Sequence, residues 1–160
     1  MPCPLIKIIT MAPSNTFYAL LQQFEGLKTD AYQDSAGIWT IGIGTIRYPD
    51  GSRVAMGDHC TVQQANEFAR YDAGKMAVKL NKLLEGVNVT QNQYDSLLSI
   101  MYNIGDMALS QSTLLKRVKF GQGDIRAAFL MWNKAKVNGV MTPVQGLTNR
   151  RNKEADLYLK

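Results

Sequence analysis

Three polar side chains near the start of the sequence have the types needed for hydrolysis of a glycosidic bond. Glu25 and Asp34 are separated by eight residues, and Asp34 and Thr40 by five. Such hydrolysis requires one carboxyl that donates a proton and a second carboxylate that acts on a water or on the sugar. A threonine hydroxyl can help to hold that water. Because all three residue types are common, their spacing alone is weak support for a site.

The elements expected around these residues give the two carboxyls different environments. Residues 15–24 have the apolar spacing of a helix, and Gly26 suits the left-handed conformation that follows a helix end. Glu25 would then lie in the last turn, where the helix dipole favours a protonated carboxyl. Asp34 falls in a turn sequence and is expected to be more solvated and ionised. One carboxyl of each protonation state is what a general acid and its partner require.

A strand is expected directly after this turn. Residues 39–44 alternate apolar side chains with Thr40 and two glycines, which is the period of a strand with one buried face. We expect Thr40 on the open face. Gly42 and Gly44 follow it there and would let a bulky polymer approach the backbone. A turn over residues 48–51 and a short returning strand at residues 53–54 would complete a small antiparallel sheet.

The rest of the chain has helical patterns. Capping boxes at Thr61 and Thr90 begin two of the expected helices. The first is long, over residues 61–85, and carries one continuous apolar stripe that starts at Val62. The second ends at Ile104 and is apolar on nearly every side, so we expect it at the centre of the second lobe. Further helices are expected over residues 111–120, from 123 to about 136, and from 148 or 149 to about 159. Asn138-Gly139 is expected to form a turn. Trp132 is expected in the core, with a sugar platform as the alternative.

Several short motifs extend beyond the candidate site. They are Phe24-Glu25-Gly26, Tyr32, Asp34, Gly37, Trp39-Thr40-Ile41-Gly42, Gly44, Tyr102-Asn103-Ile104-Gly105, Ser112-Thr113-Leu114-Leu115, Gly146-Leu147, Arg150-Arg151 and Glu154. Through them the sequence resembles the phage-type lysozymes (endolysins) of glycoside hydrolase family 24. The resemblance covers roughly residues 15–159.

The resemblance implies a mainly helical α+β, lysozyme-like fold. In this fold a small β-hairpin lobe is joined by a long helix to a helical lobe. We therefore expect a single domain over residues 1–160. Its expected parts are an extension over residues 1–14, a catalytic lobe over 15–60, a linking helix over 61–85 and a helical lobe over 86–160.

The resemblance also implies an activity. Glu25 would be the general acid, and Asp34 and Thr40 would place the attacking water. The bond cleaved would be the β-1,4 bond from N-acetylmuramic acid to N-acetylglucosamine, with inversion. Arg150, or the neighbouring Arg151, is expected to support Glu25 from the last helix. Substrate contacts are expected from Tyr32, Gly42, Gly44, Asn103, Ser112 and Thr113.

One position departs from the family pattern. The T-even phage member carries a histidine directly after the second strand glycine, paired with an aspartate on the long helix. This sequence has Thr45 at that position, and Asp72 is the expected partner. We expect a hydrogen bond between the two in place of the ion pair.

Charge is unevenly distributed along the chain. Residues 1–60 hold four Lys or Arg and five Asp or Glu, which gives −1, whereas residues 61–160 hold fourteen and eight, which gives +6. A basic second half favours an anionic polymer as partner. Peptidoglycan fits this description. A nucleic acid is not expected, because the sequence lacks a basic stripe interleaved with aromatic residues.

Metal and cofactor chemistry is not expected. His59 is the only histidine, so a histidine-based zinc site is excluded in practice, and no cofactor motif is present. Cys3 and Cys60 are expected to be free thiols, with a disulfide between them as the alternative. Residues 1–14 are too short for a membrane anchor and make a poor signal peptide. The resemblance therefore implies a monomer that stays in the host cytoplasm until a holin gives it access to the periplasm and wall.

Two other functions remain possible at this point. One is a non-catalytic binder of cell-wall polymers on the same fold. The other is a nucleic-acid module that uses the basic second half. Within the enzyme hypothesis, a transglycosylase would leave an anhydro end in place of a hydrated one.

Overall fold

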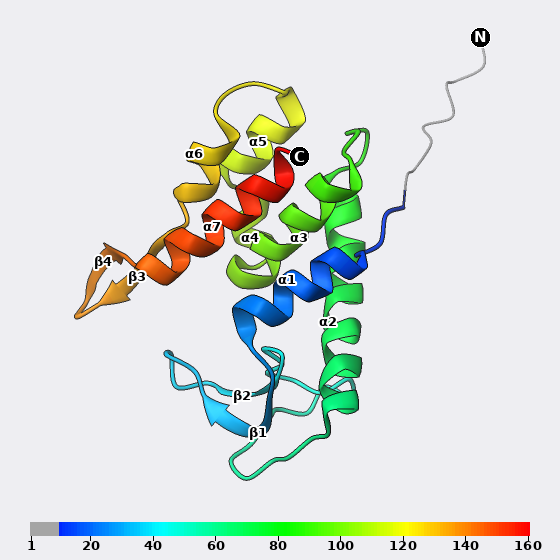
Figure 1. Cartoon of the computed structure of the whole chain (residues 1–160), viewed down its shortest axis with the longest axis vertical. Coiled ribbons are helices and arrows are strands. Elements are labelled where there is room, and N and C mark those ends of the chain that lie inside the picture. Colours follow the sequence, from blue (N-terminus) through cyan, green and yellow to red (C-terminus); the bar gives the residue numbers. More distant parts are fainter. Residues whose placement is uncertain (1–9) are drawn as a thin grey trace. The chain divides into compact units, whose positions relative to one another are not determined.

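The computed structural model describes residues 10–160, so Cys3 lies outside the described residues (Figure 1). The chain divides into two compact units, Asn15–Lys75 and Met76–Lys160, the second including the described residues up to Ser14. In chain order the elements are α1 (Asn15–Glu25), β1 (Lys28–Gln33), β2 (Trp39–Gly42), α2 (Val62–Leu83), α3 (Gln91–Ile104), α4 (Asp106–Ser110), α5 (Thr113–Phe120), α6 (Ile125–Leu130), β3 (Lys134–Val137), β4 (Val140–Pro143) and α7 (Gln145–Tyr158).

The end of α1 is formed as its sequence predicts. The helix ends at Glu25, and Gly26 follows it with φ of 70°. The Gly26 N–H donates to the Gln22 carbonyl at 2.9 Å, which satisfies one of the last carbonyls of the helix. Glu25 therefore occupies the C-terminal end of α1.

The first unit contains a two-stranded antiparallel sheet, β1–β2, drawn in cyan and blue in Figure 1. Its core consists of buried Ile41, Val54, Cys60 and Ala65. Isolated bridges extend the sheet at Asp30–His59, Ile41–Thr45 and Arg47–Arg53. The last of these replaces the returning strand expected at residues 53–54. Cys60 is a buried free thiol.

The expectation that Thr40 lies on an open face of the second strand is wrong. Thr40 is only 4% exposed, and Ile41, Gly42 and Ile43 are buried as well. The strand ends after four residues because Gly42 adopts φ of 64° and turns the chain back, so that Ile41 pairs with Thr45. Both sides of this short strand are covered as a result.

The long helix α2 begins with the predicted capping box. The Thr61 hydroxyl accepts from the Gln64 N–H at 3.1 Å, and the Gln64 side chain accepts from the Thr61 N–H at 2.9 Å. Its small apolar residues form the expected buried stripe, although the stripe's first member, Val62, is exposed. The buried members are Ala65, Ala69, Ala73 and Leu80.

In the second unit α3 is the central helix, as predicted. Residues 94–101 are buried without exception, and the capping box at Thr90 is complete. Helix α7 packs against both α3 and α6. Residues 11–14 are fastened to this unit. The Asn81 side chain donates to the Met11 carbonyl at 2.9 Å and accepts from its N–H at 3.1 Å, and Asp95 accepts from Ser14.

Three expectations for the C-terminal third are wrong: the end of the helix expected to reach residue 136, the core position of Trp132, and the start of the last helix. The helix expected to reach residue 136 ends at Leu130, and a hairpin, β3–β4, follows it. Trp132 consequently lies in a turn and is half-buried. The predicted turn at 138–139 is present, with positive φ at both residues, and it joins the two strands. Helix α7 begins at Gln145, three residues before the expected cap, and α4 was not predicted.

Among residues 10–160, no helix combines the length and the apolar character that crossing a bilayer requires.

Candidate active site

Glu25 lies at the C-terminal end of α1 with its side chain partly buried. Gly44 is its neighbour in space. A Cβ at Gly44 would lie 3.4 Å from Glu25 Oε2, and the backbone there has φ of 79°. A side chain at this position would be strained and would crowd the carboxyl. The glycine therefore keeps space open beside the Glu25 carboxyl.

Asp34 is held by the turn that it begins. Its Oδ1 accepts hydrogen bonds from the N–H groups of Ala36 at 2.8 Å and of Ile38 at 2.9 Å. The Asp34 N–H in turn donates to the Ile38 carbonyl at 3.0 Å. Within residues 10–160, Oδ2 accepts no hydrogen bond. The turn thus fixes the orientation of the carboxylate and leaves one oxygen for a further partner.

Thr40 is positioned by the same turn. Its hydroxyl donates to the Ile38 carbonyl at 3.0 Å, so the hydroxyl hydrogen is directed into the protein. The lone pairs of Oγ1 remain able to accept a hydrogen bond. Ile38 therefore orients both polar groups, through its N–H to Asp34 and through its carbonyl to Thr40.

Tyr32 pairs with Thr40 across the β1–β2 ladder. Burial raises the pKa of the Tyr32 phenol, and the negative charges of Glu25 and Asp34 raise it further. Lys28 Nζ lies 3.9 Å from the centre of the ring and covers one of its faces.

The two glycines of this region have different roles. A Cβ at Gly42 would lie 3.1 Å from the Ala65 Cβ, so this glycine is needed for the close approach of α2. Its backbone is buried and offers no open surface to a polymer. Only Gly44, which is partly exposed, lies beside a candidate catalytic group.

The predicted hydrogen bond between Thr45 and Asp72 is present. The Thr45 hydroxyl donates to Asp72 Oδ2 at 3.2 Å. Burial raises the pKa of the Asp72 carboxyl, whereas the Thr45 hydrogen bond and the positive charge of Lys75 act in the opposite direction. His59 plays no part in this region, because its exposed ring pairs with Asp30 at 2.7 Å.

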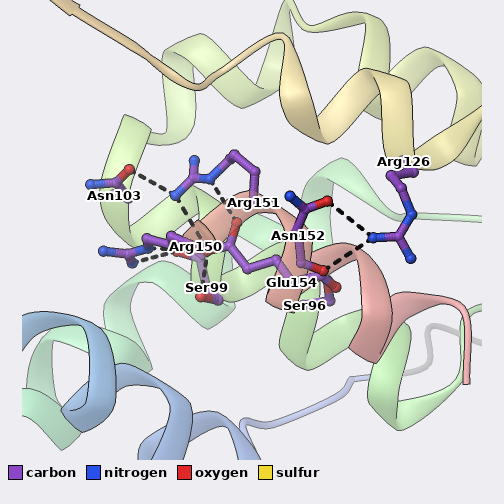
Figure 2. A network of polar contacts seen from close by, with 8 residues as sticks. All are labelled: Ser96, Ser99, Asn103, Arg126, Arg150, Arg151, Asn152 and Glu154. Carbon is purple, nitrogen blue, oxygen red and sulfur yellow. Dashed lines mark hydrogen bonds and ion pairs between the residues drawn. The ribbon is translucent and has the colours of Figure 1, made fainter. Parts of the chain in front are cut away.

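A second polar cluster lies in the helical unit, between α3 and α7 (Figure 2). Arg150 Nε lies 3.2 Å from Glu154 Oε1, and Arg151 Nε lies 2.9 Å from Glu154 Oε2. The Ser99 hydroxyl donates to Glu154 Oε1 at 2.7 Å. Burial raises the pKa of Glu154, while the two arginines and Ser99 oppose that effect. The expected support of Glu25 by Arg150 stays a prediction.

Asn103 is exposed near the end of α3, and the cluster orients its amide. Its Oδ1 accepts from Arg151 Nη2 at 2.8 Å (Figure 2). The Asn103 amide nitrogen, which can only donate, is therefore turned away from Arg151.

Ser112 and Thr113 differ in how far they are exposed to solvent. Ser112 is buried and caps α5, where its hydroxyl accepts from the Leu115 N–H at 3.0 Å and donates to the Leu109 carbonyl at 2.7 Å. Its hydrogen-bonding capacity is thus used inside the fold. Thr113, the first residue of α5, is partly exposed.

Sequence and fold comparisons agree on one class of protein. The family described as phage lysozyme matches residues 22–154, and the chain belongs to this family of glycoside hydrolases, whose members degrade peptidoglycan. An endolysin of Acyrthosiphon pisum secondary endosymbiont phage 1 is 41% identical over 140 residues, which are 87% of this chain and 92% of that relative.

Two solved structures support the same assignment. The endolysin from Escherichia coli O157:H7 phage FAHEc1 matches with a TM-score of 0.87 and 43% identity over 94% of each chain. A variant of P22 lysozyme matches with a TM-score of 0.78 and 33% identity, over 94% of this chain and 99% of that one. The predicted fold class, α+β and lysozyme-like, is therefore confirmed.

Proposed function

We propose that this protein hydrolyses the β-1,4 bond between N-acetylmuramic acid and N-acetylglucosamine, with inversion at the anomeric carbon. Glu25 is the general acid, and Asp34 and Thr40 position the attacking water. The observation that carries this proposal is the turn at Ile38, which holds the Asp34 carboxylate through the Ile38 N–H and the Thr40 hydroxyl through the Ile38 carbonyl. Helix α1, which ends at Glu25, belongs to the same compact unit as Asp34 and Thr40.

Each step of the proposed reaction is assigned to one of these groups. Glu25 donates its proton to the glycosidic oxygen as the bond breaks. The water donates one hydrogen bond to Asp34 Oδ2 and another to Thr40 Oγ1, because the Thr40 hydroxyl hydrogen is already directed at Ile38. Its lone pair then faces the anomeric carbon, and Asp34 accepts the proton that the water loses. Attack from the side opposite the leaving group inverts the configuration.

The expected substrate contacts are retained where the local structure leaves a group for substrate. Gly44 lies beside Glu25, Tyr32 pairs with Thr40, and the Asn103 amide nitrogen can donate to the carbonyl of an N-acetyl group. Thr113 is partly exposed. We leave Gly42 and Ser112 out of the binding set, because one packs against α2 and the other caps α5.

The biological setting that we propose is host-cell lysis at the end of a phage infection. The protein would remain in the host cytoplasm as a monomer until a holin gives it access to the periplasm. Its substrate there is peptidoglycan, and neither a nucleic acid nor a membrane anchor is part of the proposal.

The test of the acid is Glu25→Gln, which removes the proton donor and keeps the shape of the side chain. We expect the rate of wall hydrolysis to fall by about 10²- to 10⁴-fold, with thermal unfolding unchanged. Glu67→Gln, an exposed change of the same type on α2, is the matched control and should keep full activity.

Two results would decide against this proposal. Wild-type activity in Glu25→Gln would remove the assignment of the acid. Binding of the wild-type protein to the wall without release of reducing ends would favour the polymer-binder alternative. Mass spectrometry of the digest adds a further check, because a transglycosylase product lacks one water.

A further inference from the structure

A cavity of about 400 Å³ opens in the first unit, beside the turn that carries Asp34. This volume lies within the range of sites that hold small ligands. The walls combine apolar and cationic side chains. They include Ile38, Trp39, Ile46, Val54, Arg47 and Arg53.

The two arginines of this cavity are direct cross-strand neighbours. Arg47 and Arg53 form an isolated antiparallel bridge, so their side chains leave the same face of the chain. Like charges placed opposite each other are unfavourable without an anion between them. Arg47 donates to the Gly51 carbonyl at 3.0 Å. In the part of the chain that the structure describes, neither guanidinium forms an ion pair.

The nearest carboxylate in sequence is already engaged. Asp50, in the loop between the two arginines, accepts hydrogen bonds from the Ser52 N–H at 2.8 Å and from its hydroxyl at 2.6 Å. The cavity lining contains no acidic residue. A paired cationic site is therefore left for an external anion.

The cavity is also connected to the proposed catalytic water. The Ile38 side chain is 46% exposed and lines the cavity, while its N–H holds Asp34 and its carbonyl holds Thr40. A ligand that packs against Ile38 and Trp39 would stabilise the backbone that orients both polar groups. The anion site and the water site thus share one residue.

We propose that this cavity binds the peptide substituent of peptidoglycan, with Arg47 and Arg53 on a peptide carboxylate and short aliphatic side chains against Ile38 and Trp39. This inference rests on the proposed function, since peptidoglycan is the polymer whose muramic acid carries such peptides. Arginine pairs suit carboxylates because each guanidinium offers two parallel donors. The peptide then contributes to recognition without touching the reacting bond.

The experiment compares two substrates, solubilised peptidoglycan and the same glycan strands after enzymatic removal of the peptides. The test variant is Arg47→Ala with Arg53→Ala. The control is Lys116→Ala with Lys119→Ala, which removes the same charge from exposed positions on α5. We expect the arginine variant to lose about tenfold in kcat/KM on peptide-bearing strands and to match the wild type on bare strands. The lysine variant should match the wild type on both.

A binding measurement makes the test independent of catalysis. A free stem peptide is titrated into the protein while the indole N–H signal of Trp39 is followed by NMR. We expect a saturable shift in the wild type and none in the arginine variant. Equal losses on both substrates, no loss on either, or an unshifted indole signal in the wild type would overturn the proposal. A wild type that cleaves neither substrate would instead refute the proposed hydrolase.

Discussion

Two clusters of charged side chains in this molecule use carboxylates in opposite ways. In the first unit, Glu25 and Asp34 are partly exposed, and Asp34 is held by N–H groups of its own turn. In the helical unit, Glu154 is fully buried between Arg150, Arg151 and a serine hydroxyl. The first arrangement leaves Asp34 Oδ2 for substrate or water, whereas the second surrounds the Glu154 carboxylate with protein groups.

The two clusters are expected to differ in how much they contribute to the folding free energy. A carboxylate fixed by local backbone donors can be changed with little loss of folding free energy. A buried carboxylate that lies between two buried arginines cannot, because its removal takes away the negative charge that both arginines contact in the interior. We therefore expect the first cluster to determine activity and the second to determine stability.

The largest effect is expected for Glu154→Ala. Loss of this carboxylate leaves Arg150 and Arg151 buried beside each other, and we expect the free energy of unfolding to fall by about 3–5 kcal/mol. Asp156→Ala on the same helix is the control, since its ion pair with Arg126 is solvent-exposed and should contribute about 1 kcal/mol or less. Urea unfolding measures both. A smaller loss for Glu154→Ala than for Asp156→Ala would contradict the comparison.

The next effect concerns Thr40 and should appear in activity. Thr40→Val keeps the shape of the side chain but removes the hydroxyl that accepts from the water. We expect kcat to fall by about 10- to 100-fold, the size of one or two lost hydrogen bonds. Thr40→Ser restores the hydroxyl and should recover most of the activity. Equal kcat values for the valine and serine variants would show that the hydroxyl has no role in catalysis.

The smallest effect concerns Asp72, a carboxylate of intermediate burial, and should depend on pH. Burial raises its pKa above the ordinary value of 3.8, so the folded protein holds the proton more tightly than the unfolded chain does. As the pH rises through the folded-state pKa, the buried charge costs stability. Asp72→Asn keeps an acceptor for Thr45 and should be more stable than the wild type at pH 7.

Thermal unfolding at two pH values measures this effect. The advantage of Asp72→Asn should disappear near pH 3, where Asp72 is protonated in both the folded and unfolded wild-type protein. An equal advantage at both values would show that charge burial at Asp72 does not affect stability.

The sequence predicts those parts of the fold that are encoded locally. The end of α1 at Glu25 and the capping boxes of α2 and α3 depend on residues within one or two turns of each other. The central position of α3 follows from its apolar character on nearly every side. These features were confirmed because no distant contact is needed to produce them.

The missed features depend on tertiary context or lack a clear pattern. The strand Lys28–Gln33 is largely polar, and the hairpin of β3 and β4 is exposed on both faces, so neither shows the alternation of a half-buried strand. Burial of Thr40 results from the turn at Gly42 and the packing of α2. The pairing of Arg47 with Arg53 could have been predicted from the sequence, because the two arginines flank the turn expected over residues 48–51.

The stereochemistry of the first product tests the central claim most directly. If Glu25 protonates the leaving oxygen while Asp34 and Thr40 direct a water to the opposite side of the sugar, cleavage of the β-linked strand yields the α anomer first. Proton NMR during the first minutes of digestion distinguishes the two anomers before they equilibrate. A signal from the α anomer that precedes the β anomer is the predicted result. A β anomer formed first would contradict inversion by a water held from Asp34 and Thr40.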